Sequence, residues 1–218
     1  MAGRPAGRGQ PHLPPPAAEF AKCAPDLLSA YPSKWMRLGA VVRPSPYDWD
    51  DRAVSRFSHP SHPFKILYLA DSKETAFWEV FGAKIEDMPV DNRALYAKAQ
   101  LQTRKLIEFR VEHVLRLIDV TQEKIIHDLR SNAGTWLAPY RHCQAWARAL
   151  MDHPKKLDGF IYQACRCGAT ARCLALFSRP DEATMEKLVL PQTPPGRPSI
   201  LTDPDILRLL IQNDIDLR

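Results

Sequence analysis

The stretch RFSHPSHPFKILYLADSKETAFWEVFG, residues 56–82, says more about this chain than any other part of its sequence. It begins with Arg56, which we expect in a loop or a short strand. Tyr68 follows in the apolar run 65–70, a pattern that is typical of a buried strand. Glu79 comes next, in a helix otherwise dominated by large apolar side chains. A carboxylate in that company is either the solvated edge of the helix or a group held in a cleft for chemistry.

The helix that carries Glu79 has recognisable ends in the sequence. Asp71 is a suitable N-cap, and Glu74 follows three residues later, as in a capping box. Gly82 is a natural stop, because glycine readily adopts the backbone conformation that ends many helices. We therefore predict a helix that is capped by Asp71 and ends at Gly82.

The other periodic segments predict a mixture of strands and helices. Strands are expected over 35–42, within 94–111, and over 114–120, 160–164, 173–177 and 185–190. Helices are expected over 26–30, 121–129, 139–151 and 203–213. Because strands and helices do not alternate strictly, the pattern favours an α+β fold over a doubly wound sheet.

Proline usage divides the chain into three parts. Residues 1–33 are rich in proline and are expected to be disordered or extended. Residues 34–190 hold most of the apolar periodicity and form the expected domain. Residues 191–218 combine a proline-rich segment with a C-terminal helix, which we expect to pack on the domain.

The composition is typical of a globular protein. Of its 218 residues, 45% are hydrophobic and 25% are charged. No apolar run is long enough to cross a bilayer, and no secretory signal precedes the domain, so we expect a cytoplasmic protein without a membrane partner. The net charge of +5 favours anionic ligands such as nucleotides. Lysine and arginine are scattered along the chain, which does not predict direct nucleic-acid binding.

The cysteines predict neither disulfides nor a metal site. An odd number of thiols without a secretory signal indicates reduced cysteines, which are Cys23, Cys143, Cys165, Cys167 and Cys173. The last three lack the paired spacing of zinc ligands, and His59 and His62 do not supply it, so we expect no metal. Nor does the chain contain a GxGxxG or P-loop motif, which argues against a Rossmann or Walker nucleotide site.

Several short motifs, taken together in order and spacing, resemble the RES domain family. They are Trp35-Met36-Arg37, Arg56-Phe57, Tyr68-Leu69-Ala70, Ala76-Phe77-Trp78-Glu79 and the later segments 158–166 and 174–177. The resemblance implies a fold similar to that of ADP-ribosyltransferases, with a central mixed, mainly antiparallel split sheet flanked by helices. It also implies the toxin half of a bacterial toxin–antitoxin pair, whose partner is an antitoxin of the helix-turn-helix Xre type. Whether the chain self-associates stays open.

The same resemblance implies an enzyme that consumes NAD⁺ as substrate and needs no separate cofactor. It would be an NAD⁺ glycohydrolase or phosphorylase, or an ADP-ribosyltransferase that modifies a protein. By position, Arg37 and Arg56 match the arginines of the NAD⁺ site, Tyr68 matches its tyrosine, and Glu79 matches its catalytic glutamate. The nucleophile that reaches the sugar is water, phosphate or a protein side chain, and the sequence does not choose among them.

One position departs from the family pattern. The serine for which the family is partly named falls at Ala164, which has no hydroxyl. Cys165 is adjacent, but in a strand its side chain would point to the opposite face. Either a bulge shifts the alignment by one residue, or the protein works without that hydroxyl, or it is impaired. The alternative function is therefore a catalytically impaired module that binds a nucleotide or an antitoxin.

The chemistry of the proposed residues fits the reaction. Cleavage of the nicotinamide–ribose bond builds positive charge on the sugar, and a fixed carboxylate such as Glu79 can stabilise it. Arg37 and Arg56 offer permanently charged forks to the pyrophosphate, and Tyr68 offers a flat face to the nicotinamide ring. Each of these residues also has a plainer interpretation, as a solvated charge, a core-edge ion pair or a core tyrosine.

Overall fold

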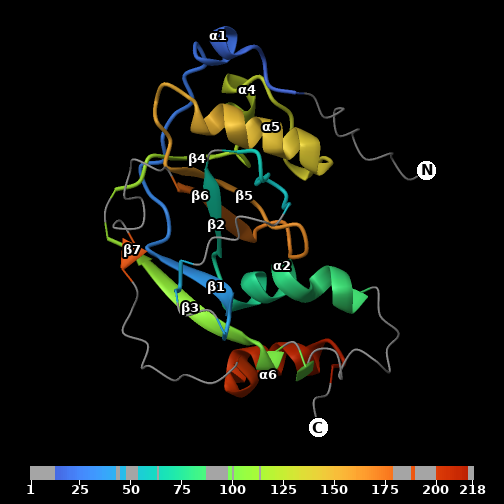
Figure 1. Cartoon of the computed structure of the whole chain (residues 1–218). Helices are drawn as coiled ribbons and strands as arrows, with labels where there is room; N and C mark the ends of the chain where they lie inside the picture. Colours follow the sequence, from blue (N-terminus) through green and yellow to red (C-terminus); the bar gives the residue numbers. More distant parts are fainter. Residues whose placement is uncertain are drawn as a thin grey trace, which may run out of the picture.

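One mixed sheet organises the computed structural model (Figure 1), which describes residues 13–42, 45–47, 54–62, 64–86, 98–99, 101–112, 114–178, 188–189 and 200–215. Its strand order is β4-β5-β6-β2-β1-β3-β7. The strands are β1 (Lys34–Ala40), β2 (Lys65–Ala70), β3 (Arg104–Val111), β4 (Leu117–Asp119), β5 (Gly159–Gln163), β6 (Arg172–Ser178) and β7 (Leu188–Val189). The helices are α1 (Ala17–Phe20), α2 (Lys73–Glu86), α4 (Glu123–Asp128), α5 (Tyr140–Met151) and α6 (Pro204–Gln212), with short 3₁₀ turns at Thr135–Leu137 and Ile200–Thr202.

The sheet is split between β1 and β2. β4 and β5 run parallel, and every other neighbouring pair is antiparallel. β1 pairs with β3 along its whole length, whereas it meets β2 at a single residue pair, Met36 with Ala70. The two halves of the sheet therefore diverge from this pair. The predicted α+β fold with a mixed, mainly antiparallel split sheet is confirmed.

Side-chain alternation along the strands buries both faces of the sheet. In β2, Ile66 and Ala70 join the large cluster on the helical side, while Leu67 and Leu69 join a second cluster on the opposite face. That second cluster is covered by Leu28 and Tyr31 from the segment that precedes β1. A strand with apolar residues on both faces reads as a continuous apolar run, which is why 65–70 could be located from the sequence.

Both ends of the helix that carries Glu79 differ from the prediction. Ser72, not Asp71, caps α2, because its Oγ accepts a hydrogen bond from the backbone N–H of Thr75 at 3.0 Å. The Asp71 carboxylate instead accepts from the backbone N–H of Arg172 at 2.7 Å. The helix also continues through Gly82 to Glu86. Gly82 is a site of close approach, since a Cβ there would lie 3.2 Å from the Cβ of Arg166.

Residues 13–33 pack on the domain, whereas the sequence predicted a disordered or extended segment over 1–33. Phe20 of α1 is 3% exposed, and its ring meets the ring of Trp146 edge-on at 5.6 Å between centroids. The Nε2 of His153 lies 3.1 Å from the carbonyl oxygen of Cys23, and the Lys155 ammonium donates to the Pro25 carbonyl at 2.6 Å. One buried aromatic ring and these polar contacts hold residues that composition alone would leave loose. Residues 1–12 lie outside the described part, and 26–30 form no helix.

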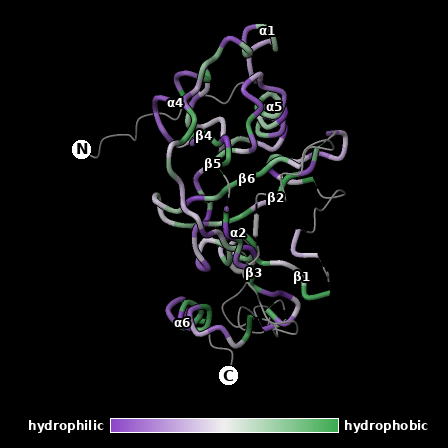
Figure 2. The backbone as a smooth tube through the Cα atoms, turned by 90° about the vertical axis from the view of Figure 1, so that its left-hand side faces the viewer, coloured by the Kyte–Doolittle hydropathy of each residue, from purple (hydrophilic) through white to green (hydrophobic). Residues whose placement is uncertain are grey.

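The helices occupy opposite ends of the molecule. Figures 1 and 2 both place α1, α4 and α5 at one end and α6 at the other, with α2 between them. The helices predicted over 139–151 and 203–213 are confirmed as α5 and α6. Lys73 at the start of α2 donates to Asp203 at 2.9 Å and to Asp205 at 2.8 Å, which ties α6 to the helix that carries Glu79.

The remaining predictions hold in part. The predicted strand over 114–120 is shorter, as β4, and the one over 185–190 is β7, with two residues. Within 94–111 the strand is β3, and most of what precedes it lies outside the described residues. A helix long and apolar enough to span a membrane does not occur in the described ranges.

Candidate active site

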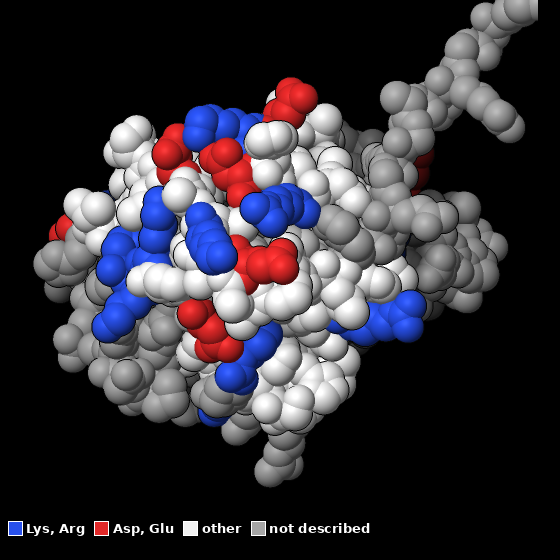
Figure 3. All heavy atoms as spheres, turned by 90° about the horizontal axis from the view of Figure 1, so that it is seen from above, with Lys and Arg blue, Asp and Glu red and all other residues white. Residues whose placement is uncertain are grey.

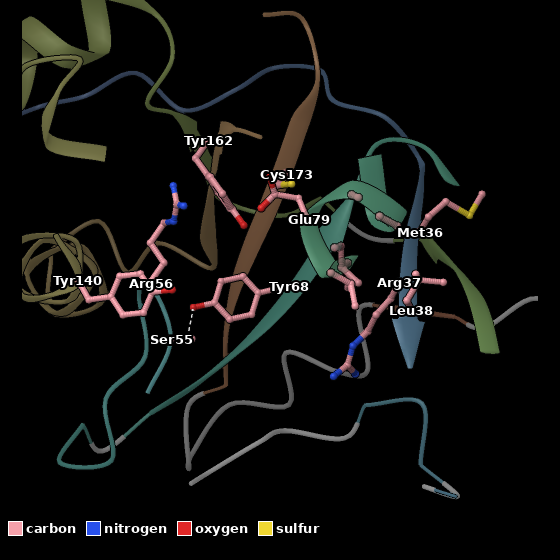
Figure 4. Close-up of a pocket in the computed structure, with 14 residues that line it drawn as sticks. Met36, Arg37, Leu38, Ser55, Arg56, Tyr68, Glu79, Tyr140, Tyr162 and Cys173 are labelled. Carbon is pink, nitrogen blue, oxygen red and sulfur yellow. Dashed lines mark hydrogen bonds between the residues drawn. The ribbon is translucent and has the colours of Figure 1, made fainter. Parts of the chain in front are cut away.

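A pocket of about 350 Å³ lies where the two halves of the sheet diverge (Figure 4). Arg37 from β1, Arg56 from a loop, Tyr68 from β2 and Glu79 from α2 all line it. The structure therefore brings together all four residues that the sequence singled out. The other lining residues are Met36, Leu38, Ser55, Leu69, Ala70, Ala76, Val80, Tyr140, Tyr162 and Cys173.

Glu79 is held by backbone groups. Its Oε1 accepts a hydrogen bond from the N–H of Cys165 at 2.5 Å and another from the N–H of Arg166 at 3.3 Å. Thr75, one turn earlier on the same face of α2, is 3% exposed. Glu79 itself is half-buried, and its hydrogen bonds to the loop after β5 favour a held carboxylate over a freely solvated one. Both backbone donors meet Oε1, and within the described residues Oε2 has no donor.

The loop after β5 determines the orientation of Ala164 and Cys165 relative to the site. β5 ends at Gln163, so the strand alternation expected to turn Cys165 away from the site does not extend to it. Ala164 is 2% exposed and packs in the apolar core. Cys165 faces the site with two of its groups, because its N–H donates to Glu79 and its Sγ accepts from Arg56 Nη1.

Arg56 reaches the pocket from a tight turn. Besides Cys165 Sγ, its Nη1 lies 3.5 Å from the carbonyl oxygen of Trp136. Burial opposes the charged guanidinium, but Cys165, Tyr162 and Glu79 outweigh this effect and raise the pKa of Arg56. Burial in turn raises the pKa of the Cys165 thiol, and the nearby Arg56 cation partly offsets that rise. The cation therefore lies at a fixed place on the pocket wall, beside a neutral thiol.

The Tyr68 hydroxyl forms its hydrogen bonds with other groups of the protein. The oxygen accepts a hydrogen bond from the N–H of Phe57 at 3.1 Å and lies 2.7 Å from Ser55 Oγ. Its ring stacks on Phe57, with 6.3 Å between centroids. Burial raises the pKa of the phenol, so it stays protonated. The Tyr68 hydroxyl thus anchors the turn that carries Arg56.

Arg37 lies apart from Arg56. Figure 4 shows the two guanidinium groups on opposite sides of the Tyr68 ring. Arg37 Nη1 donates to the carbonyl oxygen of Pro46 at 2.7 Å, which draws the side chain toward the loop that follows β1. Two cationic groups therefore flank the pocket from different elements, rather than forming one cluster.

Sequence reasoning missed Tyr162 as a lining residue. It is 4% exposed and comes from β5, on the same face of the strand as the core residue Phe160. Figure 4 shows its hydroxyl directed into the pocket near Glu79. Burial raises the pKa of Tyr162 well above its ordinary value, with Cys173 and Glu79 adding to the rise, so the hydroxyl is a neutral donor. The alternation of β5 could have revealed this position, two residues before Ala164.

The described residues contain no group of three or more His, Cys, Asp or Glu side chains placed to hold an ion. Burial raises the pKa of Cys167 to about 11, although a hydrogen bond from Thr75 opposes the rise. A protonated thiol is a poor metal ligand. The ring centroids of His59 and His62 are 5.8 Å apart on a partly exposed loop.

The surface around α1 shows no single-sign patch. In Figure 3, lysine and arginine alternate with aspartate and glutamate over this end of the molecule. The ion pairs of α4 and α5 include Lys124 with Asp26 at 2.7 Å and Arg148 with Asp152 at 2.6 Å.

Comparison with known proteins identifies one family and one fold. The model of the RES domain matches residues 34–196. Among solved structures, the fold is similar to a chain in the crystal structure of the M. tuberculosis MbcT–MbcA toxin–antitoxin complex, with a TM-score of 0.56 and 18% identity, over 81% of this chain and 89% of that one. No curated protein matches the chain significantly.

Proposed function

The chain belongs to the RES domain family, and on that premise we propose that it is an NAD⁺-consuming toxin of a toxin–antitoxin pair. It cleaves the bond between nicotinamide and ribose and passes the ADP-ribose part to water, phosphate or a protein. The observation that carries the proposal is the convergence of Arg37, Arg56, Tyr68 and Glu79 on one pocket from four separate segments.

Glu79 is the catalytic residue in this proposal. Nicotinamide leaves as a neutral molecule, so the reaction needs little acid catalysis and depends on stabilising the cationic sugar. With Oε1 fixed by two backbone N–H groups, Oε2 is the oxygen available to the sugar or its hydroxyls. A carboxylate that is already oriented spends no energy on reorganisation as charge develops. The same oxygen can accept a proton from the incoming nucleophile.

The cations and the tyrosine ring bind the rest of the substrate. Arg56 and Arg37, on opposite sides of Tyr68, are placed to contact different parts of the pyrophosphate and its flanking ribose. One face of Tyr68 is covered by Phe57, so the nicotinamide ring would stack on the other. Tyr162 adds a neutral hydroxyl beside Glu79, where it can orient a ribose hydroxyl or the nucleophile.

The missing serine does not argue against activity. A hydroxyl at position 164 could serve to orient the catalytic glutamate, but here the backbone N–H groups of Cys165 and Arg166 perform that task. Backbone donors are independent of residue type, so the site can work with Ala164. This favours the second of the three explanations left open by the sequence, a protein that works without the hydroxyl.

The partner in this proposal is an antitoxin of the helix-turn-helix Xre type. The structurally similar MbcT chain was solved in a complex with MbcA, which is described as a toxin–antitoxin pair. We therefore expect coexpression with a cognate antitoxin to protect cellular NAD⁺ from this chain. Coexpression that leaves NAD⁺ depletion unchanged would argue against the pairing.

The test is product analysis of NAD⁺ incubated with the purified protein. We expect wild-type protein to release nicotinamide, and mass analysis with and without phosphate to distinguish ADP-ribose from its phosphorylated form. Glu79→Gln keeps the size and one acceptor oxygen of the side chain but removes its charge, so release should fall by at least about 100-fold. Glu74→Gln is the matched control, because Glu74 lies on the same helix and is exposed.

Two results would contradict the proposal. Full turnover by Glu79→Gln would exclude the carboxylate from the chemistry. A wild-type protein whose melting temperature rises with NAD⁺ but that releases no nicotinamide would support the impaired binding module instead. If transfer to a protein is the reaction, the acceptor must be present, so the assay is repeated in a cell lysate with labelled NAD⁺.

A further inference from the structure

The turn that carries Arg56 is a small closed unit. The N–H of Ser55 donates to the carbonyl oxygen of Ser58 at 3.1 Å, and the N–H of Ser58 donates to Ser55 Oγ at 3.3 Å. Phe57 is fully buried and anchors the turn in the core. Arg56 projects from this unit toward Cys165 and Trp136. The position of the guanidinium therefore depends on how the turn is held.

Gln144 of α5 holds the turn from outside. Its Nε2 donates to the carbonyl oxygens of Ser55 at 2.8 Å and Ser58 at 3.1 Å, the two ends of the turn. Gln144 is 8% exposed, so few other partners could satisfy its amide. Both partners are acceptors, which fixes the amide with its nitrogen toward the turn. From the other side, Tyr68 accepts from the N–H of Phe57.

We propose that Gln144 is a positioning residue that sets the place of Arg56 and, through it, the binding of the substrate's phosphate groups. Only its last step, the effect on binding of the substrate's phosphate groups, rests on the proposed function. The turn is clamped between β2 and α5, through Tyr68 and Gln144. Without the α5 clamp, the Ser55 carbonyl loses its partner and the Ser58 carbonyl keeps only the N–H of Ser55, so the turn can pivot about Phe57. The guanidinium at its tip then leaves the pocket wall.

A double-mutant cycle tests the functional step. Gln144→Met keeps the volume but removes both donors, and we expect it to raise KM for NAD⁺ about tenfold with a smaller effect on kcat, since misplaced binding groups weaken substrate positioning. In an Arg56→Ala background, Gln144→Met should have no further effect on KM. An equal rise in KM in both backgrounds, or no rise in either, would overturn the proposal.

The matched control is Gln122→Met. Gln122 is exposed, and its amide makes one long contact of 3.4 Å to Asp119, away from the pocket. KM should be unchanged in this variant. If Gln144→Met does not fold, Gln144→Asn serves as the second variant, because it keeps both donors but shortens their reach by one methylene. It should raise KM in the same direction as Gln144→Met.

A second measurement tests the positioning step without NAD⁺. Arg56 touches the Cys165 thiol and holds its pKa down against burial. If Gln144→Met releases Arg56, the pH profile of Cys165 alkylation should move to higher pH, as it should in Arg56→Ala, while Cys167 keeps its profile. An unchanged Cys165 profile in Gln144→Met would refute the positioning role. If the profile moves but wild-type protein releases no nicotinamide, the proposed function fails and the positioning role stands.

Discussion

Gly82→Ala would perturb the contact between α2 and the loop that holds Glu79. The new Cβ would lie 3.2 Å from the Cβ of Arg166, a distance that forces one of the two to shift by a few tenths of an ångström. The N–H of Arg166 donates to Glu79 Oε1 at 3.3 Å, already near the limit of a hydrogen bond. A shift that lengthens this distance by a few tenths of an ångström would break the bond, whereas the shorter bond from Cys165 would persist.

The magnitudes predict a loss of activity with only a small loss of stability. Alanine in place of glycine favours a helix by about 0.5–1 kcal/mol, which offsets the strain of the new contact. A hydrogen bond to a charged group contributes about 1.5–3 kcal/mol, and a bond as long as 3.3 Å belongs at the lower end. Since 1.4 kcal/mol is a factor of ten in rate, kcat should fall about tenfold. Loss of the same bond also destabilises the folded state, and the helix gain offsets about half of it, so the free energy of unfolding should fall by about 1 kcal/mol.

The assay pairs nicotinamide release with urea unfolding for the two variants Gly82→Ala and Gly168→Ala. Gly168 lies in the same loop as Arg166, and nothing lies within 4 Å of a Cβ built there, so its substitution controls for the loss of a glycine near the site. The reasoning fails if Gly82→Ala keeps kcat within twofold of wild type. It also fails if Gly168→Ala loses as much activity, because the contact with α2 would then be irrelevant.

Three further predictions concern the segment before β1 and the loop after β5. Phe20→Ala should destabilise the protein by about 3–5 kcal/mol, measured by urea unfolding, because the ring is buried against Trp146; a loss below 1 kcal/mol would mean that this segment does not pack. Burial lowers the pKa of His153 in the folded state below the 6.5 of the free side chain, so its contribution is complete above that pH and is lost as the pH falls through the folded pKa. Urea midpoints at pH 7, 6 and 5 should therefore fall more steeply for wild type than for His153→Gln, and equal slopes would contradict this. Ala164→Ser should not raise kcat, and it should cost about 1–3 kcal/mol of stability by burying a hydroxyl; a tenfold gain in kcat would show that the site needs that group.

The strands and the site residues could be predicted because they carry local signals. β2 appears in the sequence as an apolar run, and its bounds were predicted without error. α5 and α6 have helix-opening prolines and apolar residues at helical spacing. The residues Arg37, Arg56, Tyr68 and Glu79 were found through the order of short motifs, and the structure places all four on one pocket. Their roles in the reaction stay predictions.

Contacts between distant segments were not predictable. Nothing near Gly82 in the sequence indicates that Arg166 lies against it. The sequence therefore predicted that the helix ends at this glycine. In the same way, the burial of Phe20 depends on Trp146 and His153, which follow it by more than a hundred residues. Composition alone therefore predicted disorder for a segment that packs. Gln144 carried no signal at all, because its partners are two backbone carbonyls.

Backbone support also changes how the departure at Ala164 should be interpreted. When a motif is defined by its side chains, the absence of the hydroxyl is interpreted as a loss of function. In this structure the groups that hold Glu79 are the N–H donors of Cys165 and Arg166, and any residue except proline can supply them. The site therefore depends on the path of the loop, and a side chain at position 82 would press on Arg166 where α2 approaches this loop. A proline at 165 or a larger residue at 82 should thus impair the site more than the absence of a serine at 164.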